Sequence, residues 1–436
     1  MPYNEWQSMY PNLYFFLKDT FGTEPWAWTK FVNSFGFFVA IAFILSAMVL
    51  ARELKRKERE GLLFPVEETI ITGKPASLQE LLINALLGFL VGYKAFGIFL
   101  NSDQIPPQEY IFSAKGSWGG GIVLALVFAG LKYREKAKQK LGKPEKRKIR
   151  VWPHERVGDI TIYAAVFGFI GAKLFDNFEN WDRFIQNPVE NLLSPSGLTF
   201  YGGLICATIA ILWYARKKKI SIRHLVDAAA PMLMLAYALG RIGCQVSGDG
   251  DWGILNSAYV TSASGKAVEA GPGDFEQALN THKTIYLSEF GTDSIPRIPV
   301  KAPSFLPTWT VAYAYPHNVN EQGFRMEGCE GDHCNALPVP VFPTPFYEII
   351  TCLFLFLVLM GLRKKITIPG QMFAVYLILN GLERFFIEKI RVNTKYDLFG
   401  FHPTQAEIIS TLLVVAGIAL FFYAKKNTGL ATTAKA

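Results

Sequence analysis

Charged residues and histidines are scarce in this chain. Of its 436 residues, 18% are charged and six are histidine, whereas 50% are hydrophobic. An ordinary soluble domain carries about 25% charged residues. The mean hydropathy is positive, at +0.21. The shortage of charge argues against an ordinary soluble protein and favours a chain whose main solvent is lipid.

Cysteines are also few, with five in the whole sequence. Three lie in or beside apolar segments and are expected to be small packing residues: Cys206, Cys244 and Cys352. Cys329 and Cys334 stand in a polar loop and could form a disulfide if that loop faces an oxidising compartment. Together with His333 they supply too few ligands for zinc, so no metal site is predicted.

The positively charged start of a cleavable signal peptide is missing as well. The first apolar run begins near Phe31, after several acidic residues. The net charge of +8 does not indicate nucleic acid, because basic residues cluster directly after apolar stretches, at 52–59 and 216–219. Such clusters are typical of the cytoplasmic ends of membrane helices.

Nine segments are candidates for membrane-spanning helices, which need about 20 mostly apolar residues. They are 31–50, 81–100, 118–131, 160–175, 198–215, 225–245, 346–362, 370–390 and 405–424. With Arg391 set aside as a helix-end residue, lysine and arginine number 28 on one side of these spans and 10 on the other. The richer side should be cytoplasmic. The predicted fold class is an all-α polytopic membrane protein with its N-terminus outside and its C-terminus inside.

A helical hairpin is repeated within the chain. The first copy reads Gly92-Tyr-Lys94, Gly120-Gly121 and Tyr133, and the second reads Gly171-Ala-Lys173, Gly202-Gly203 and Tyr214. Transporters are often built from repeats, so this feature alone does not favour an enzyme. The segment 246–345 is rich in glycine, proline and aromatic residues. It is expected to form a small extracytoplasmic head domain.

Several predicted spans contain ionisable residues, which are costly in lipid and usually functional. They are Lys94, Lys173, Arg241, Glu383, Arg384 and Glu388. A helical rise of about 1.5 Å per residue places the four cations in the outer half of a core about 30 Å thick. Arginines at this depth suit an anionic phosphate, because the guanidinium can donate two hydrogen bonds to it. The alternatives to a phosphate-binding role are a structural ion pair between Arg384 and Glu388, and lysines that snorkel to the membrane interface.

Five motifs, in order, resemble those of the prolipoprotein diacylglyceryl transferase family. Gly240-Arg241-Ile242-Gly243 with Asp249 resembles its Gly-Arg-x-Gly-Asn-x-x-Asn-Gly-Glu signature, with Cys244 and Ser247 in place of the asparagines and one residue inserted before Trp252. Tyr201-Gly202-Gly203-Leu204 resembles His-Gly-Gly-Leu, and Phe342-Pro343-Thr344-Pro345-Phe346-Tyr347-Glu348 resembles His-Pro-Ser-Gln-Leu-Tyr-Glu. Arg384-Phe-Phe-Ile-Glu388-Lys-Ile-Arg391 and Gln405 with its apolar run complete the set.

This resemblance covers about 160–253 and 340–424. It implies seven spans with the N-terminus outside and the C-terminus inside, and the repeated hairpin adds two more spans without changing the sides of the two ends. It implies an enzyme of the bacterial inner membrane that needs no cofactor. The enzyme transfers the diacylglyceryl group of phosphatidylglycerol to the lipobox cysteine of a prolipoprotein signal peptide. On this basis we divide the chain into an N-terminal membrane region with the extra hairpin (1–159), transferase-like helices (160–245), a head loop (246–345) and C-terminal transferase-like helices (346–436).

The resemblance also implies a role for each matching residue. Arg241 and Arg384 bind the head group, Glu388 orients Arg384, and Asp249 organises the site. Gly202, Gly203 and Gly253 belong to the substrate-binding set. Tyr201 takes the place of the family's histidine, and a phenol near pKa 10 is a poor base at neutral pH.

Three explanations of the base stay open. Tyr201 beside an arginine is acidic enough, or Asp249, Glu348 or His402 serves, or no base is needed because the substrate thiol is already partly ionised. Two other functions compete with the transferase. The replaced histidine, asparagines and glutamine favour a non-catalytic lipid- or lipoprotein-binding paralogue, whereas the repeat alone favours a transporter.

Overall fold

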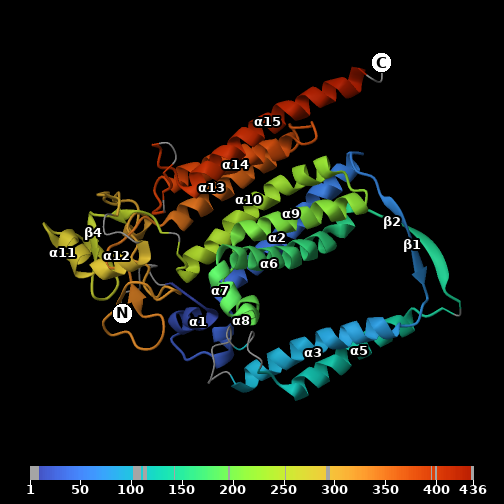
Figure 1. Ribbon diagram of the computed structural model, residues 1–436, viewed down its shortest axis with the longest axis horizontal. Coiled ribbons are helices and arrows are strands. Elements are labelled where there is room, and N and C mark those ends of the chain that lie inside the picture. Colours follow the sequence, from blue (N-terminus) through green and yellow to red (C-terminus); the bar gives the residue numbers. More distant parts are fainter. Residues whose placement is uncertain are drawn as a thin grey trace. The chain divides into compact units, whose positions relative to one another are not determined.

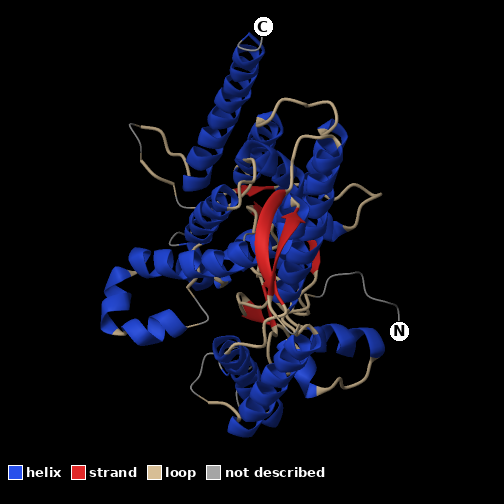
Figure 2. Cartoon of the chain, turned by 90° about the vertical axis from the view of Figure 1, so that its right-hand side faces the viewer, coloured by secondary structure: helices blue, strands red, loops and turns tan. Residues whose placement is uncertain are grey.

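The computed structural model describes residues 9–101, 110, 115–141, 143–194, 197–250, 252–290, 295–393, 395–397 and 400–433. Most of these residues are helical, and the strands form four two-stranded sheets (Figure 1, Figure 2). Contacts divide the chain into two compact units. The first comprises Met1–Glu24, Val32–Glu53 and Arg223–Ala436, and the second comprises Pro25–Phe31 and Leu54–Ile222.

Six described helices are long and apolar enough to cross a membrane, and the chain is a mostly helical, multi-pass membrane protein. Their spans are Ser34–Arg59, Leu78–Ile98, Pro153–Glu179, Ile222–Ser247, Thr344–Leu362 and Gln405–Lys426. The three other predicted spans are also helical: α5 (Trp118–Lys138), α9 (Phe200–Lys217) and α14 (Gln371–Glu388). Each of these three is shorter in its apolar part, and α14 carries three charged residues. The count of nine spans and their orientation stay predictions.

The first unit contains α1 (Leu13–Phe21), most of α2 (Ser34–Arg59), nearly all of α10 (Ile222–Ser247), α13 (Thr344–Leu362), α14 and α15 (Gln405–Thr433). Helices α13, α14 and α15 lie side by side (Figure 1). Small residues permit this: a Cβ on Gly381 of α14 would lie 2.7 Å from the Ser410 carbonyl oxygen of α15. An apolar core joins α10, α13 and α14 through Ala230, Met234, Ala238, Cys352, Leu359 and Met372.

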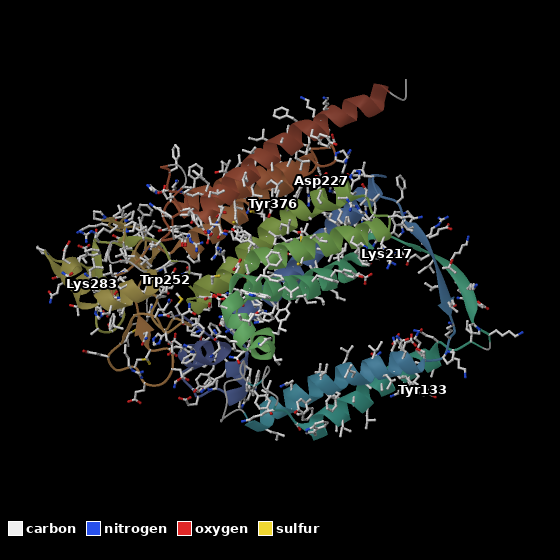
Figure 3. The ribbon with its side chains drawn as sticks, viewed as in Figure 1. Tyr133, Lys217, Asp227, Trp252, Lys283 and Tyr376 are labelled. Carbon is white, nitrogen blue, oxygen red and sulfur yellow. A yellow bond between two sulfur atoms is a disulfide. The ribbon has the colours of Figure 1, made fainter. Side chains whose placement is uncertain are left out.

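Polar caps fix where the helices of this unit begin. The Asp227 carboxylate of α10, labelled in Figure 3, accepts hydrogen bonds from the N–H groups of Gly370 (2.8 Å) and Phe373 (3.0 Å) at the start of α14. Thr404 and Glu407 form a reciprocal capping box at the start of α15, at 3.2 and 3.0 Å. These bonds satisfy N–H groups that the first turn of a helix leaves without partners.

The head segment of the first unit has its own small core. It contains the paired strands β3 (Leu255–Asn256) and β6 (Arg297–Ile298), β4 (Tyr259–Thr261) and β5 (Ala267–Glu269), and β7 (Phe324–Arg325) and β8 (Asn335–Ala336). Helices α11 (Asp274–Thr281) and α12 (Lys283–Phe290) complete it. Buried aromatic residues such as Trp252, Tyr313 and Tyr315 fill its interior. Cys329 and Cys334 form a disulfide, which the sequence left open.

The second unit contains two helical hairpins. In one, α3 (Leu78–Asn101) packs on α5, and the antiparallel strands β1 (Val66–Thr72) and β2 (Glu145–Val151) enclose this hairpin in sequence. In the other, α6 (Val157–Glu179) packs on α9, with the short helices α7 (Trp181–Gln186) and α8 (Pro188–Leu193) between them. Figure 1 shows the two strands running together to the ends of α3 and α5.

In both hairpins, glycines at corresponding positions make the closest contacts between the two helices, and this similarity supports a duplication. A Cβ on Gly92 of α3 would lie 2.2 Å from the Gly120 carbonyl oxygen, and one on Gly171 of α6 would lie 2.4 Å from that of Gly202. A backbone hydrogen bond also recurs in both copies: the carbonyl group of the residue that follows this glycine accepts a hydrogen bond from the N–H group of the residue just before the second helix. These bonds join Ser117 to Tyr93 at 2.8 Å and Thr199 to Ala172 at 3.1 Å.

The lysines of the two hairpins bind loop carbonyl groups. Lys94 donates to the carbonyl oxygens of Tyr110 (3.2 Å) and Lys115 (3.0 Å). Lys173 donates to that of Gly197 at 3.4 Å. Each lysine therefore ties the connection of its hairpin to its helix. These contacts favour the structural interpretation of both residues.

Candidate functional site

A cluster of charged side chains lies where α10, α13 and α14 meet, in the first unit. Its centre is Glu348, one turn into α13, whose side chain is fully buried. A buried charge is costly unless it is paired and hydrogen-bonded. Glu348 meets this condition, because it pairs with guanidinium groups from two other helices and accepts a hydrogen bond from the Tyr237 hydroxyl at 2.7 Å.

Arg241 and Arg384 share the two oxygens of Glu348. The Arg241 Nε lies 2.9 Å from Glu348 Oε2, and the Arg384 Nη1 lies 3.2 Å from Oε1. The two arginine side chains are 15% and 22% exposed. A guanidinium carries five N–H donors, and one carboxylate cannot occupy all of them on both arginines. The arrangement therefore brings two guanidinium groups from different helices to one carboxylate in a partly exposed place.

Arg384 has a second carboxylate partner one turn along its own helix. Its Nη2 lies 3.0 Å from Glu388 Oε2, and Asn393 donates a hydrogen bond of 2.6 Å to the other oxygen of Glu388. Arg384 is thus held from two sides. Arg384 lies about one turn before the C-terminal end of α14 and Glu348 about one turn after the N-terminal start of α13, so each of these two charges interacts favourably with its helix dipole.

Two predicted site residues lie just after α10. The Asp249 N–H donates to the Cys244 carbonyl oxygen at 3.1 Å, and the Asp249 carboxylate accepts a hydrogen bond of 3.4 Å from Asn320. Among the described residues, Asp249 pairs with neither arginine. The Gly253 N–H donates to the Phe342 carbonyl oxygen at 2.9 Å, and a Cβ on Gly253 would lie 2.6 Å from that oxygen. Gly253 is therefore held tightly at the start of the head segment.

The remaining predicted residues belong to the second unit. Tyr201 lies in the first turn of α9, half-buried, with its ring 5.7 Å from that of Phe200. Gly202 faces α6, because a Cβ there would lie 2.4 Å from the Cβ of Phe175, and Gly203 faces the same helix. The close approach that these glycines permit in the structure is that of α6. Their role toward lipid stays a prediction.

Sequence analysis missed one member of the cluster, Tyr237. Tyr237 precedes Arg241 by one helical turn, and its ring lies 5.5 Å from the guanidinium carbon. Its spacing to Arg241 was the available signal. Glu383 is among the ionisable residues that the sequence places within the predicted spans, and no role is predicted for it. Its side chain is 5% exposed.

Comparisons with known proteins show the family to which the chain belongs. The family model described as prolipoprotein diacylglyceryl transferase matches residues 112–423. The chain belongs to this family. Among curated relatives, the phosphatidylglycerol–prolipoprotein diacylglyceryl transferase of Shouchella clausii is 25% identical over 328 residues, which cover 74% of this chain and 92% of the relative. The enzyme of the same name from Dehalococcoides mccartyi is 26% identical over 284 residues, covering 63% and 83%.

The match to the prolipoprotein diacylglyceryl transferase family extends further than the motifs indicated. It takes in α5, β2 and the head segment, which the motif resemblance left out. A shorter relative match, to the Leptospira interrogans enzyme of the same name, is 31% identical over 140 residues, covering 27% of this chain and 44% of the relative. Arg241, Glu348, Arg384 and Glu388 all lie within the matched range.

Proposed function

We propose that this protein is a phosphatidylglycerol–prolipoprotein diacylglyceryl transferase of the bacterial inner membrane. The observation that carries the proposal is the pair of guanidinium groups gathered by the buried Glu348. Together they supply the positive charge and the N–H donors that one lipid phosphate needs. Family membership supplies the class of reaction.

In the proposed reaction the thiol sulfur of a lipobox cysteine attacks the carbon of the diacylglycerol unit that is bonded to the phosphate oxygen. A carbon–sulfur bond forms, the carbon–oxygen bond breaks, and glycerol phosphate leaves with the bonding electrons. Because the nucleophile belongs to the substrate, the enzyme needs no nucleophile of its own. Its task is to position the phosphate and to stabilise the charge that grows on the leaving oxygen. Arg241 and Arg384 perform this task, and Glu388 positions Arg384.

The membrane arrangement that fits this chemistry has nine spans, with the N-terminus outside and the C-terminus inside. It places the outer ends of α10 and α14, and with them both arginines, near the head groups of the outer leaflet. The head segment then lies outside the membrane, where a disulfide persists. This arrangement keeps the four segments predicted from the sequence. They are the N-terminal membrane region with the extra hairpin (1–159), the transferase-like helices (160–245), the head loop (246–345) and the C-terminal transferase-like helices (346–436).

The structure shows the surroundings of each candidate base. Glu348 is committed to two arginines. His402 is exposed, and its Nδ1 lies 3.9 Å from Oδ1 of Asp397. Asp249 is bound by Asn320. Whether a protein base is needed at all is a prediction that a Tyr201→Phe variant tests for the tyrosine, because it removes only the hydroxyl group.

A complementation experiment tests the proposal. The protein and its Arg241→Ala and Arg384→Ala variants are produced in cells depleted of their own transferase, and prolipoprotein is followed by its shift in mobility. Arg147→Ala is the matched control, since that arginine lies on β2 and is 60% exposed. The wild type and the control should restore lipidation, and both site variants should fail. A well-expressed wild-type protein that restores nothing would favour the non-catalytic paralogue or the transporter.

A further inference from the structure

The second unit contains a small cavity, where the residues that follow α2 and α9 meet those that precede α6. Its volume is about 160 Å³. Its lining residues fall within 62–66, 151–156 and 218–221, and all of these ranges belong to the second unit. No described residue of the lining belongs to the charged cluster around Glu348. The proposed reaction therefore makes no use of this cavity.

Three basic side chains line this cavity. They belong to Arg156, Lys218 and Lys219, and no acidic residue is among the lining residues that the structure describes. The Arg156 Nη2 lies 2.7 Å from Glu68 Oε1, and the Lys218 Nζ lies 2.9 Å from the same oxygen. One carboxylate oxygen thus brings two cations from different segments together, in the way that a phosphate oxygen does.

These charges are within reach of a ligand that enters from outside. The side chains of Lys218 and Glu68 are 28% and 30% exposed, whereas that of Arg156 is 5% exposed. A partly exposed ion pair contributes little to stability, so a phosphate can replace the Glu68 carboxylate beside Lys218 at small cost. The buried Arg156 stays in place and supplies the fixed part of the site.

The rest of the lining is largely apolar, and part of it is exposed. Leu63 and Ile220 are buried, whereas Leu62 and Phe64 are 38% and 72% exposed. A soluble phosphate gains nothing from exposed apolar side chains beside a cation, but a lipid covers them with its hydrocarbon chains. The lining therefore favours an amphipathic anion over a freely soluble one.

Neighbouring residues indicate that the cavity lies at a membrane interface. Trp213 of α9 is 52% exposed, and the Lys217 Nζ lies 4.9 Å from the centre of its ring. Lys217, labelled in Figure 3, is the last residue of α9 and directly precedes the two lysines of the cavity. Exposed tryptophan beside lysine is typical of the ends of membrane helices. In the proposed membrane arrangement this end is cytoplasmic, where basic pockets bind the head groups of anionic lipids.

We propose that this cavity binds an anionic phospholipid of the inner leaflet. Arg156 and Lys218 bind a phosphate of the head group in exchange for Glu68, and the exposed Lys219 adds positive charge at the rim. The exposed apolar residues of the lining contact the hydrocarbon chains. No covalent bond is made or broken, and the lipid ties the cytoplasmic end of the second unit to the bilayer. The inference goes beyond the transferase function and uses the proposed orientation only to name the leaflet.

A lipid titration tests the inference, with cardiolipin as the probe. The purified full chain in detergent micelles is titrated with cardiolipin, and bound lipid is counted by native mass spectrometry. Replacing Lys218 and Lys219 together by glutamine should weaken binding by about tenfold or more, since each basic residue near an anionic lipid contributes about fivefold. The matched control replaces Lys146 and Arg147, two exposed cations of β2 outside the cavity, and should bind as the wild type does. Glu68→Gln, which removes the competing carboxylate, should bind cardiolipin more tightly.

Three further arms identify the ligand and its place. Phosphatidylcholine should bind about tenfold more weakly than cardiolipin, because it has no net charge. Millimolar inorganic phosphate should leave cardiolipin bound, and Arg241→Ala should keep the wild-type affinity because Arg241 is outside the cavity. Equal affinities of the lysine variant and its matched control would overturn the inference. Displacement by inorganic phosphate would also overturn it, as would loss of binding in Arg241→Ala, which would place the lipid in the charged cluster instead.

Discussion

Replacing Glu348 by glutamine removes the negative charge that two guanidinium groups share. The side chain is fully buried and lies 2.9 Å from Arg241 and 3.2 Å from Arg384. Removing one partner of a buried pair costs about 3–5 kcal/mol, because the other charge stays buried without compensation. Arg384 keeps Glu388 as a partner and Arg241 is partly exposed, so we expect the lower end of this range, about 3 kcal/mol. That loss corresponds to about a hundredfold change in the unfolding equilibrium.

A double-mutant cycle isolates the contribution of the pair. Glu348→Gln, Arg241→Met and the double variant are unfolded in mixed micelles, and the free energies of unfolding are compared with that of the wild type. Residues in direct contact show interaction energies of about 0.5–3 kcal/mol. The double variant should therefore lose clearly less than the sum of the two single losses. Additive losses would refute the view that Glu348 holds Arg241 in place.

Three further predictions concern the rest of the chain. Gly202→Ala should destabilise the protein by about 1–3 kcal/mol, the usual cost of overpacking, because the new Cβ would lie 2.4 Å from a side-chain carbon of α6. The control variant Gly119→Ala should leave stability unchanged, because a Cβ at Gly119 meets no atom within 4 Å. Thermal unfolding of both variants measures the difference. Burial lowers the pKa of His317 below its ordinary value of 6.5. The buried, neutral His317 therefore stabilises the fold fully above about pH 6.5, and this stabilisation is lost as the pH falls through its lowered folded-state pKa. In His317→Gln the free energy of unfolding should change less with pH below about 6.5. Cys329 and Cys334 should resist thiol labelling until reductant is added, and their reduction should cost about 2 kcal/mol for so short a loop, measured by thermal unfolding.

The helices were predictable because lipid imposes a strong requirement on sequence. A span needs about 20 apolar residues with all backbone groups bonded internally, and this pattern is visible without a structure. The predicted segments all coincide with helices, and the glycine pairs that revealed the repeat are the close contacts of both hairpins. The head segment gave no such signal, because its strands are only two or three residues long.

Sequence analysis singled out Arg241, Arg384 and Glu388, but not the contacts that join the helices of the cluster. Arg241 and Arg384 stood out because arginine within a span is costly, and the four-residue spacing of Arg384 and Glu388 indicated their ion pair. That Glu348 joins both arginines depends on how three helices pack, which spacing along one helix does not specify.

The most direct test of the central claim is the rate of diacylglyceryl transfer by purified protein in nanodiscs of defined lipid. Arg241→Ala and Arg384→Ala are compared with the wild type by kcat/KM, using phosphatidylglycerol and a lipobox peptide. Removing one donor that stabilises a growing negative charge usually costs about 10²- to 10³-fold. We predict a loss of that size for each variant, with the fold intact by thermal unfolding. Wild-type kcat/KM in either variant would contradict the proposal that these two arginines bind the lipid phosphate.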